Sequence, residues 1–173
     1  MRFDRVVLRL FEDLQAALRD AIPQGQTVIV TVTAPIKLPG RTALALEDRI
    51  RRDLARKPTG RSRATIHGNG IRLHWLADIP AGMPKLVGLV HNRDTDPAII
   101  LEVTEALIRH IGARAAAHRM RPSEKGRWLI LANEAGLSHI ETYRQIWRRI
   151  AIAVGFEKIL LVLAGGRVET LEG

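Results

Sequence analysis

Stretches with the period of an α-helix alternate with short stretches that have the pattern of a β-strand along most of the chain. Apolar residues recur at helical spacing over residues 3–22 and 41–57. Between them, residues 27–33 (TVIVTVT) alternate Val with Thr, which predicts a strand with one apolar and one mostly polar face. Strands that alternate with helices are typical of an α/β fold in which at least part of the sheet is parallel.

Residues 64–76 carry the clearest local signal, which predicts a β-hairpin. Asn69-Gly70 suits a type I′ turn, because both central residues of that turn need a positive φ. A turn at this dipeptide places Ile66 opposite Leu73, so that apolar residues face apolar residues and polar residues face polar ones. A slip by one residue would exchange the two faces, and the pattern therefore supports this register.

The second half of the chain repeats the alternation. Residues 85–91 and 128–132 predict buried strands, because they are apolar almost throughout. A helix is expected from Pro97 to about residue 111, and it is apolar around most of its circumference. His110 falls on the apolar side of this helix, which predicts an interior histidine.

A further helix and a second hairpin complete the predicted elements. Ser138 and Glu141 match a capping box that opens the helix. Gly165-Gly166 predicts the turn of the second hairpin. We therefore expect residues 1–173 to form a single α/β domain with a mixed, partly parallel sheet, two hairpins, and helices packed on the faces of the sheet.

The chain has no cysteine, which excludes disulfides, thiolate zinc sites and cysteine nucleophiles. Any metal site must therefore use His, Asp or Glu. The N-terminal residues mix charged and apolar side chains and do not resemble a signal peptide. No window reaches the roughly 18 apolar residues of a membrane span. These features predict a cytoplasmic protein that is not bound to a membrane.

The loops that follow the strands are where an α/β enzyme would carry its catalytic groups. Two of them contain His91, Asp94, Asp96 and Glu134, which would converge if the two strands are parallel neighbours. His91, Asp94 and Glu134 are candidate catalytic residues, and Asp94 and Asp96 are candidate ligands of a divalent metal ion. This pattern predicts a metal-dependent hydrolase or nuclease. The competing interpretation is that Asp94 and Asp96 only cap the helix that begins at Pro97.

The formal net charge is +9 at pH 7, which favours a polyanionic partner such as nucleic acid. Arginine forks pair with phosphate oxygens irrespective of base sequence. The candidate nucleic-acid-binding residues are Arg49, Arg52, Arg56, Arg61, Arg72, Arg119, Arg121 and Arg127. Their common role requires that they share one face of the protein. Otherwise they are solvated surface charges, some of them paired with acids one helical turn away.

A third hypothesis is that the chain is a homo-oligomeric partner-binding domain. It is motivated by the helix at residues 97–111, because a helix that is apolar on nearly all sides needs packing partners on each of them. Those partners are either other elements of the same chain or a second copy of it.

Overall fold

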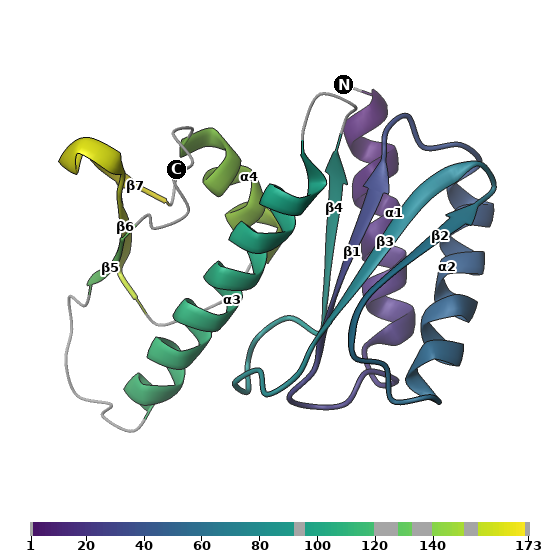
Figure 1. Cartoon of the computed structure of the whole chain (residues 1–173), viewed down its shortest axis with the longest axis horizontal. Coiled ribbons are helices and arrows are strands. Elements are labelled where there is room, and N and C mark those ends of the chain that lie inside the picture. Colours follow the sequence, from purple (N-terminus) through teal and green to yellow (C-terminus); the bar gives the residue numbers. More distant parts are fainter. Residues whose placement is uncertain (1, 92–95, 120–127, 133–139, 151–155, 172–173) are drawn as a thin grey trace. The chain divides into compact units, whose positions relative to one another are not determined.

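The computed structural model describes residues 2–91, 96–119, 128–132, 140–150 and 156–171. Over this part of the chain, four α-helices and seven strands alternate, and the strands form two partly parallel sheets (Figure 1). The α/β class and the mixed character of the strand pairing are confirmed. The chain divides into two compact units: residues 1–79 with 84–101 form unit 1, and residues 80–83 with 102–173 form unit 2.

Unit 1 contains a four-stranded sheet with the order β2-β3-β1-β4. The strands are β1 (Thr27–Thr33), β2 (Gly60–Ile66), β3 (Asn69–Leu76) and β4 (Leu86–His91). β1 pairs in parallel with β4, and the β2–β3 hairpin adds to the other side of β1 in the antiparallel direction. The predicted bounds of β1 are confirmed, but its Thr face is also buried, because Thr27 and Thr31 are almost fully shielded from solvent.

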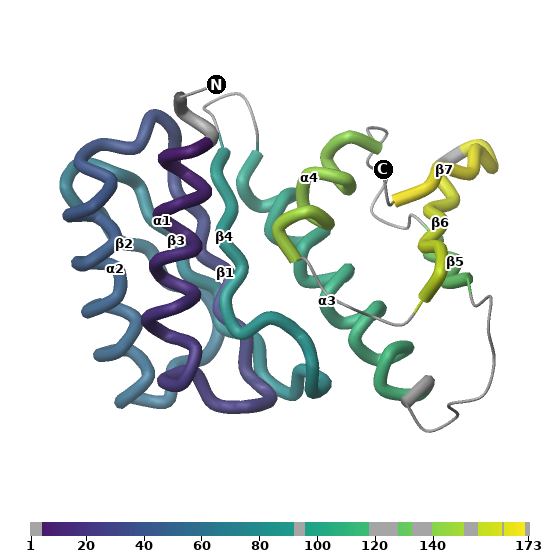
Figure 2. Tube along the Cα trace, turned by 180° about the vertical axis from the view of Figure 1, so that it is seen from behind, coloured from purple at the N-terminus to yellow at the C-terminus, as the bar shows by residue number. Residues whose placement is uncertain are grey.

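Two helices, α1 (Arg2–Leu18) and α2 (Pro39–Leu54), lie side by side on one face of this sheet (Figures 1 and 2). Their apolar sides join the inward side chains of the strands in one core. α1 passes so close to β4 that a Cβ atom added to Gly88 would overlap the ring of Phe11. Only glycine therefore fits at position 88 while Phe11 keeps its place.

The β2–β3 hairpin forms as expected, but its turn is not at Asn69-Gly70. His67 and Gly68 take the two positions with positive φ, at 49° and 74°. Ile66 therefore pairs with Asn69 and not with Leu73, and the predicted register was wrong. The turn has moved by two residues, an even number, so each side chain stays on the face expected for it.

Asn69 does not occupy a central position of the turn, because its side chain forms hydrogen bonds with Lys37 and Thr42. It is 2% exposed. Its Oδ1 accepts a hydrogen bond from the backbone N–H of Lys37 at 2.7 Å, and its Nδ2 donates to the Lys37 carbonyl at 2.9 Å. Nδ2 also lies 3.0 Å from both the Thr42 hydroxyl and the Ile66 carbonyl. One amide therefore holds the hairpin to the loop before α2 and to the first turn of that helix.

Unit 2 has a three-stranded sheet with the order β5-β6-β7. β5 (Trp128–Ala132) pairs in parallel with β6 (Lys158–Val162), which pairs with β7 (Val168–Thr170) in an antiparallel hairpin. The second predicted hairpin is thus confirmed, with Gly165 and Gly166 both at positive φ.

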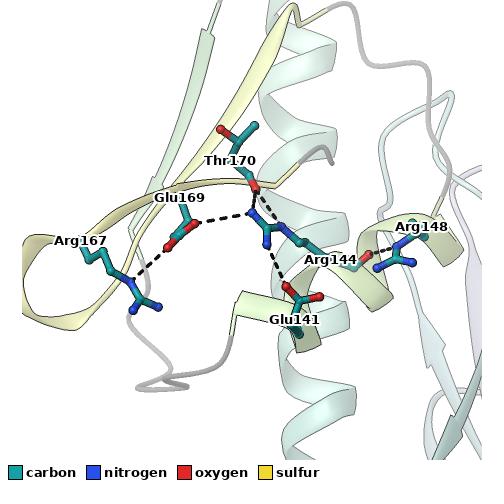
Figure 3. A network of polar contacts seen from close by, with 6 residues as sticks. All are labelled: Glu141, Arg144, Arg148, Arg167, Glu169 and Thr170. Carbon is teal, nitrogen blue, oxygen red and sulfur yellow. Dashed lines mark hydrogen bonds and ion pairs between the residues drawn. The ribbon is translucent and has the colours of Figure 1, made fainter.

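An arginine joins α4 (Ile140–Ile150) to this hairpin (Figure 3). Arg144 donates to the Thr170 carbonyl from Nε and Nη2 at 3.2 and 3.1 Å. It also pairs with Glu141 at 2.8 Å and with Glu169 at 3.6 Å, and Glu169 in turn pairs with Arg167. Arg144 is thus occupied by structural contacts.

α3 (Pro97–Arg119) extends beyond the predicted end at residue 111. Its apolar residues are largely buried within the single chain, Ile108 and Ile111 completely. His110 is exposed, so the prediction of an interior histidine was wrong. Among the helices of the described ranges, none combines the length and the apolar character needed to cross a bilayer.

Candidate functional site

The β2–β3 hairpin carries three arginines on one face. Arg61 and Arg63 are two residues apart on β2, so they point to the same side of the sheet. Arg72 lies on β3 directly opposite Arg63, and directly opposed residues share a face. We call Arg61, Arg63 and Arg72 the basic face.

The basic face lies on the side of the sheet away from α1 and α2. The alternate residues of the hairpin, such as Ala64, Ile71 and Leu73, belong to or pack against the core that those helices cover. Because successive side chains of a strand point to opposite sides, the arginines point away from that core. Arg61 and Arg63 are exposed, and Arg72 is partly exposed.

The guanidinium of Arg61 is held in place by a histidine. Arg61 and His74 are cross-strand partners, and Arg61 Nε donates to His74 Nδ1 at 3.0 Å. Accepting this bond requires that Nδ1 carries no proton, so the ring is in the neutral tautomer that is protonated at Nε2. His74 is 8% exposed, so its buried ring holds the side chain of Arg61, which is itself exposed.

The three arginines of the basic face pair with no acidic side chain in the part of the chain that the structure describes. Other arginines do have such partners: Arg49 contacts Asp53 through Nε at 2.9 Å, and Arg109 contacts Glu105 at 3.0 Å. Arg63 and Arg72 instead face one another. Like charges in directly opposed positions repel, so positive potential is concentrated at this point.

The structure separates the arginines that the sequence grouped together. Arg61 and Arg72 lie on the basic face. Arg49, Arg52 and Arg56 lie on or just after α2, which covers the opposite face of the sheet, so these five do not form one surface (Figure 2). The side chain of Arg119, and the whole of Arg121 and Arg127, lie outside the described residues.

Arg63 was not among the predicted residues, although the sequence contains a signal for it. The strand GRSRATI places Arg61 and Arg63 at alternate positions, so any face that holds one must hold the other.

The proposed metal and catalytic residues are described only in part. His91 and Thr33 end the parallel strands β4 and β1, and the His91 Nε2 and Thr33 Oγ1 atoms are 3.1 Å apart. Asp96 Oδ1 accepts a hydrogen bond from the backbone N–H of Ala98 at 2.8 Å, which is the geometry of a helix cap.

Asp94 and Glu134 lie outside the described residues. Within the described ranges, no three His, Asp or Glu side chains are grouped as metal ligands would be. The hydrolase hypothesis therefore stays a prediction, and of its two described members, His91 and Asp96, Asp96 caps a helix.

Comparison of the chain with protein-family models, with curated proteins and with solved structures found no match. Function is therefore inferred from the geometry of the site.

Proposed function

We propose that this protein binds nucleic acid through the phosphate backbone, and that the basic face of Arg61, Arg63 and Arg72 is the contact surface. The observation that carries this proposal is the direct opposition of Arg63 and Arg72 with no acidic partner among the described residues. A phosphate between the two guanidinium groups would convert their repulsion into two charge-assisted contacts.

The spacing of the three cations suits a chain of phosphates. Arg61 and Arg63 are about 7 Å apart along β2, and the Cβ atoms of Arg63 and Arg72 are about 5 Å apart across the hairpin. Arg61 Nε is bonded to His74, which leaves the outer nitrogens of the guanidinium fork for a ligand.

Binding to the backbone is favoured over recognition of single-stranded bases. Proteins that bind bases on a sheet use aromatic side chains as stacking platforms. The aromatic residue of this hairpin, Trp75, belongs to the core on the other side of the sheet. We therefore expect affinity that depends strongly on salt and little on base sequence.

The test is the binding of labelled duplex DNA and RNA to the full chain at about 50 and 200 mM salt. Three phosphate contacts on a duplex give a slope of about −2.7 in log affinity against log salt, which weakens binding about 40-fold over this range. The triple variant Arg61→Gln, Arg63→Gln, Arg72→Gln should lose most of the affinity and most of the salt dependence.

The matched control is the triple variant Arg9→Gln, Arg52→Gln, Arg56→Gln. It removes the same charge from exposed positions on or next to α1 and α2. Equal weakening by both triple variants would show an effect of overall charge and would contradict a localised site. Absence of binding at about 50 mM salt, where phosphate contacts are strongest, would contradict the proposed function itself.

A further inference from the structure

A cavity of about 440 Å³ lies within unit 2. Its walls come from α3, β5, α4 and β6, and the residues of its apolar surface include Leu107, Leu129, Leu131 and Leu161. Leu107, Leu129 and Leu161 are buried, whereas Glu102, His110 and Arg114 are exposed, so the cavity is open to solvent. Cavities of roughly 300–1,000 Å³ with apolar walls and a few polar groups are the usual form of small-molecule sites.

The polar groups of the cavity lie along its α3 wall. Glu102, His110 and Arg114 all line it. The helical rise places the Cα atoms of His110 and Arg114 about 6 Å apart, and that of Glu102 about 12 Å from His110. The cavity therefore has an acidic end, and an end where a guanidinium and an imidazole are close together.

The charges at the two ends restrict which ligand fits. Arg114 forms no ion pair with any other residue of the described ranges, whereas Arg109, five residues earlier on the same helix, is paired with Glu105. A carboxylate matches a guanidinium fork in two parallel hydrogen bonds. A ligand with one negative charge would balance the charge of Arg114, whereas Glu102 would repel a second negative charge on the ligand.

Tyr143 of α4 also lines the cavity and adds no charge to it. Burial raises the pKa of its phenol above the ordinary value of 10.0, so the group stays neutral at physiological pH. Apart from Glu102, His110 and Arg114, the lining of the cavity is uncharged.

We propose that this cavity binds a small monocarboxylate with an apolar body, with the carboxylate at Arg114 and His110 and the hydrocarbon against Leu107 and Leu129. The site is formed by residues of unit 2 alone, and it is independent of the basic face in unit 1.

The experiment is calorimetric titration of the full chain with decanoate, and with decan-1-ol and decylamine as probes of the same apolar length. Decanoate should bind more tightly than decanol, which carries no charge for Arg114, and decylamine should bind only with its ammonium at the Glu102 end, so that Arg114→Gln does not weaken its binding. Arg114→Gln should weaken decanoate binding about tenfold or more and leave decanol binding within about twofold, since only the charge-assisted hydrogen bonds are lost.

Two further variants separate binding in the cavity from binding elsewhere on the protein. Arg109→Gln is the matched control, because Arg109 is exposed on the same helix but does not line the cavity, and it should not change decanoate binding. Ala106→Trp fills the cavity from an exposed position and should abolish the binding of all three probes. Equal weakening by Arg114→Gln and Arg109→Gln, unchanged binding to Ala106→Trp, or no decanoate binding at all would overturn the proposal.

Discussion

Arg63 and Arg72 are cross-strand partners, directly opposite one another in the β2–β3 hairpin. Directly opposed like charges destabilise a strand pair, typically by a few tenths of a kcal/mol to about 1 kcal/mol. Neither arginine has an acidic partner in the described residues, so nothing in that part of the chain offsets the repulsion. A bound anion would offset it, and ligand binding and hairpin stability should therefore be coupled.

We expect Arg63→Thr to raise the free energy of unfolding by about 0.5 kcal/mol while it weakens nucleic-acid binding, because the variant removes one of the two opposed charges. Urea denaturation at low and high salt measures the gain, which should shrink as salt screens the charges. Arg63→Lys is the control, since it keeps a positive charge opposite Arg72. An equal gain in both variants would show that repulsion between the two charges is not responsible.

Asn69→Ala should lower the free energy of unfolding by about 2–4 kcal/mol, because it leaves buried polar groups of three segments without their partner. Thermal and urea denaturation measure the loss. Thr65→Ala changes an exposed residue of the same hairpin and should stay within about 0.5 kcal/mol of the parent protein. A small effect of Asn69→Ala would mean that water replaces the amide without cost.

Gly88→Ala should destabilise the protein by about 2 kcal/mol or more, because the added methyl group would overlap the ring of Phe11. Combining it with Phe11→Ala removes the ring, so the double variant should lose less stability than the two single losses added together. Gly40→Ala is the matched control, since a Cβ atom there meets nothing within 4 Å. Additive losses at positions 11 and 88 would contradict the close approach of α1 to β4.

Asp96→Ala should cost about 1 kcal/mol of stability, whereas Asp96→Asn should be nearly neutral, because asparagine also caps helices well. Denaturation with and without Mn²⁺ distinguishes a cap from a metal ligand. If Asp96 acts only as a helix cap, Mn²⁺ should change the stability of neither the parent protein nor the two variants. Stabilisation by Mn²⁺ that both variants lose would instead favour the metal site at Asp94 and Asp96.

The order and type of the elements could be predicted because their apolar spacing is regular. β1 was expected at residues 27–33 and is found there, and Pro97 opens α3 behind the cap of Asp96. The hairpin register could not be predicted, because the local preference of Asn69-Gly70 for a turn competes with tertiary hydrogen bonds of the Asn69 side chain. His67 and Gly68 occupy the two central positions of the turn instead of Asn69 and Gly70.

The candidate site was predictable only in part for a similar reason. Clusters of arginine along the sequence do not reveal which face of a sheet carries them, and α2 places Arg49 and Arg52 on the side opposite to Arg61 and Arg72. The two-residue period of a strand was sufficient to place Arg63 on the same face as Arg61. The division of the strands between two sheets has no comparable local signal, because it depends on which strands pair across distant parts of the chain.

The side chain of Asn69 bonds to residues up to 32 positions away in the sequence. The loop before α2, the start of that helix and the hairpin turn therefore share one amide, and none of them can open without breaking its bonds to the others. In native-state hydrogen exchange, such segments behave as one cooperative unit. We therefore expect the hairpin turn to open only when the first turn of α2 opens as well. Fluctuations that move the loop alone leave the β2–β3 pairing intact, and with it the relative positions of the three arginines.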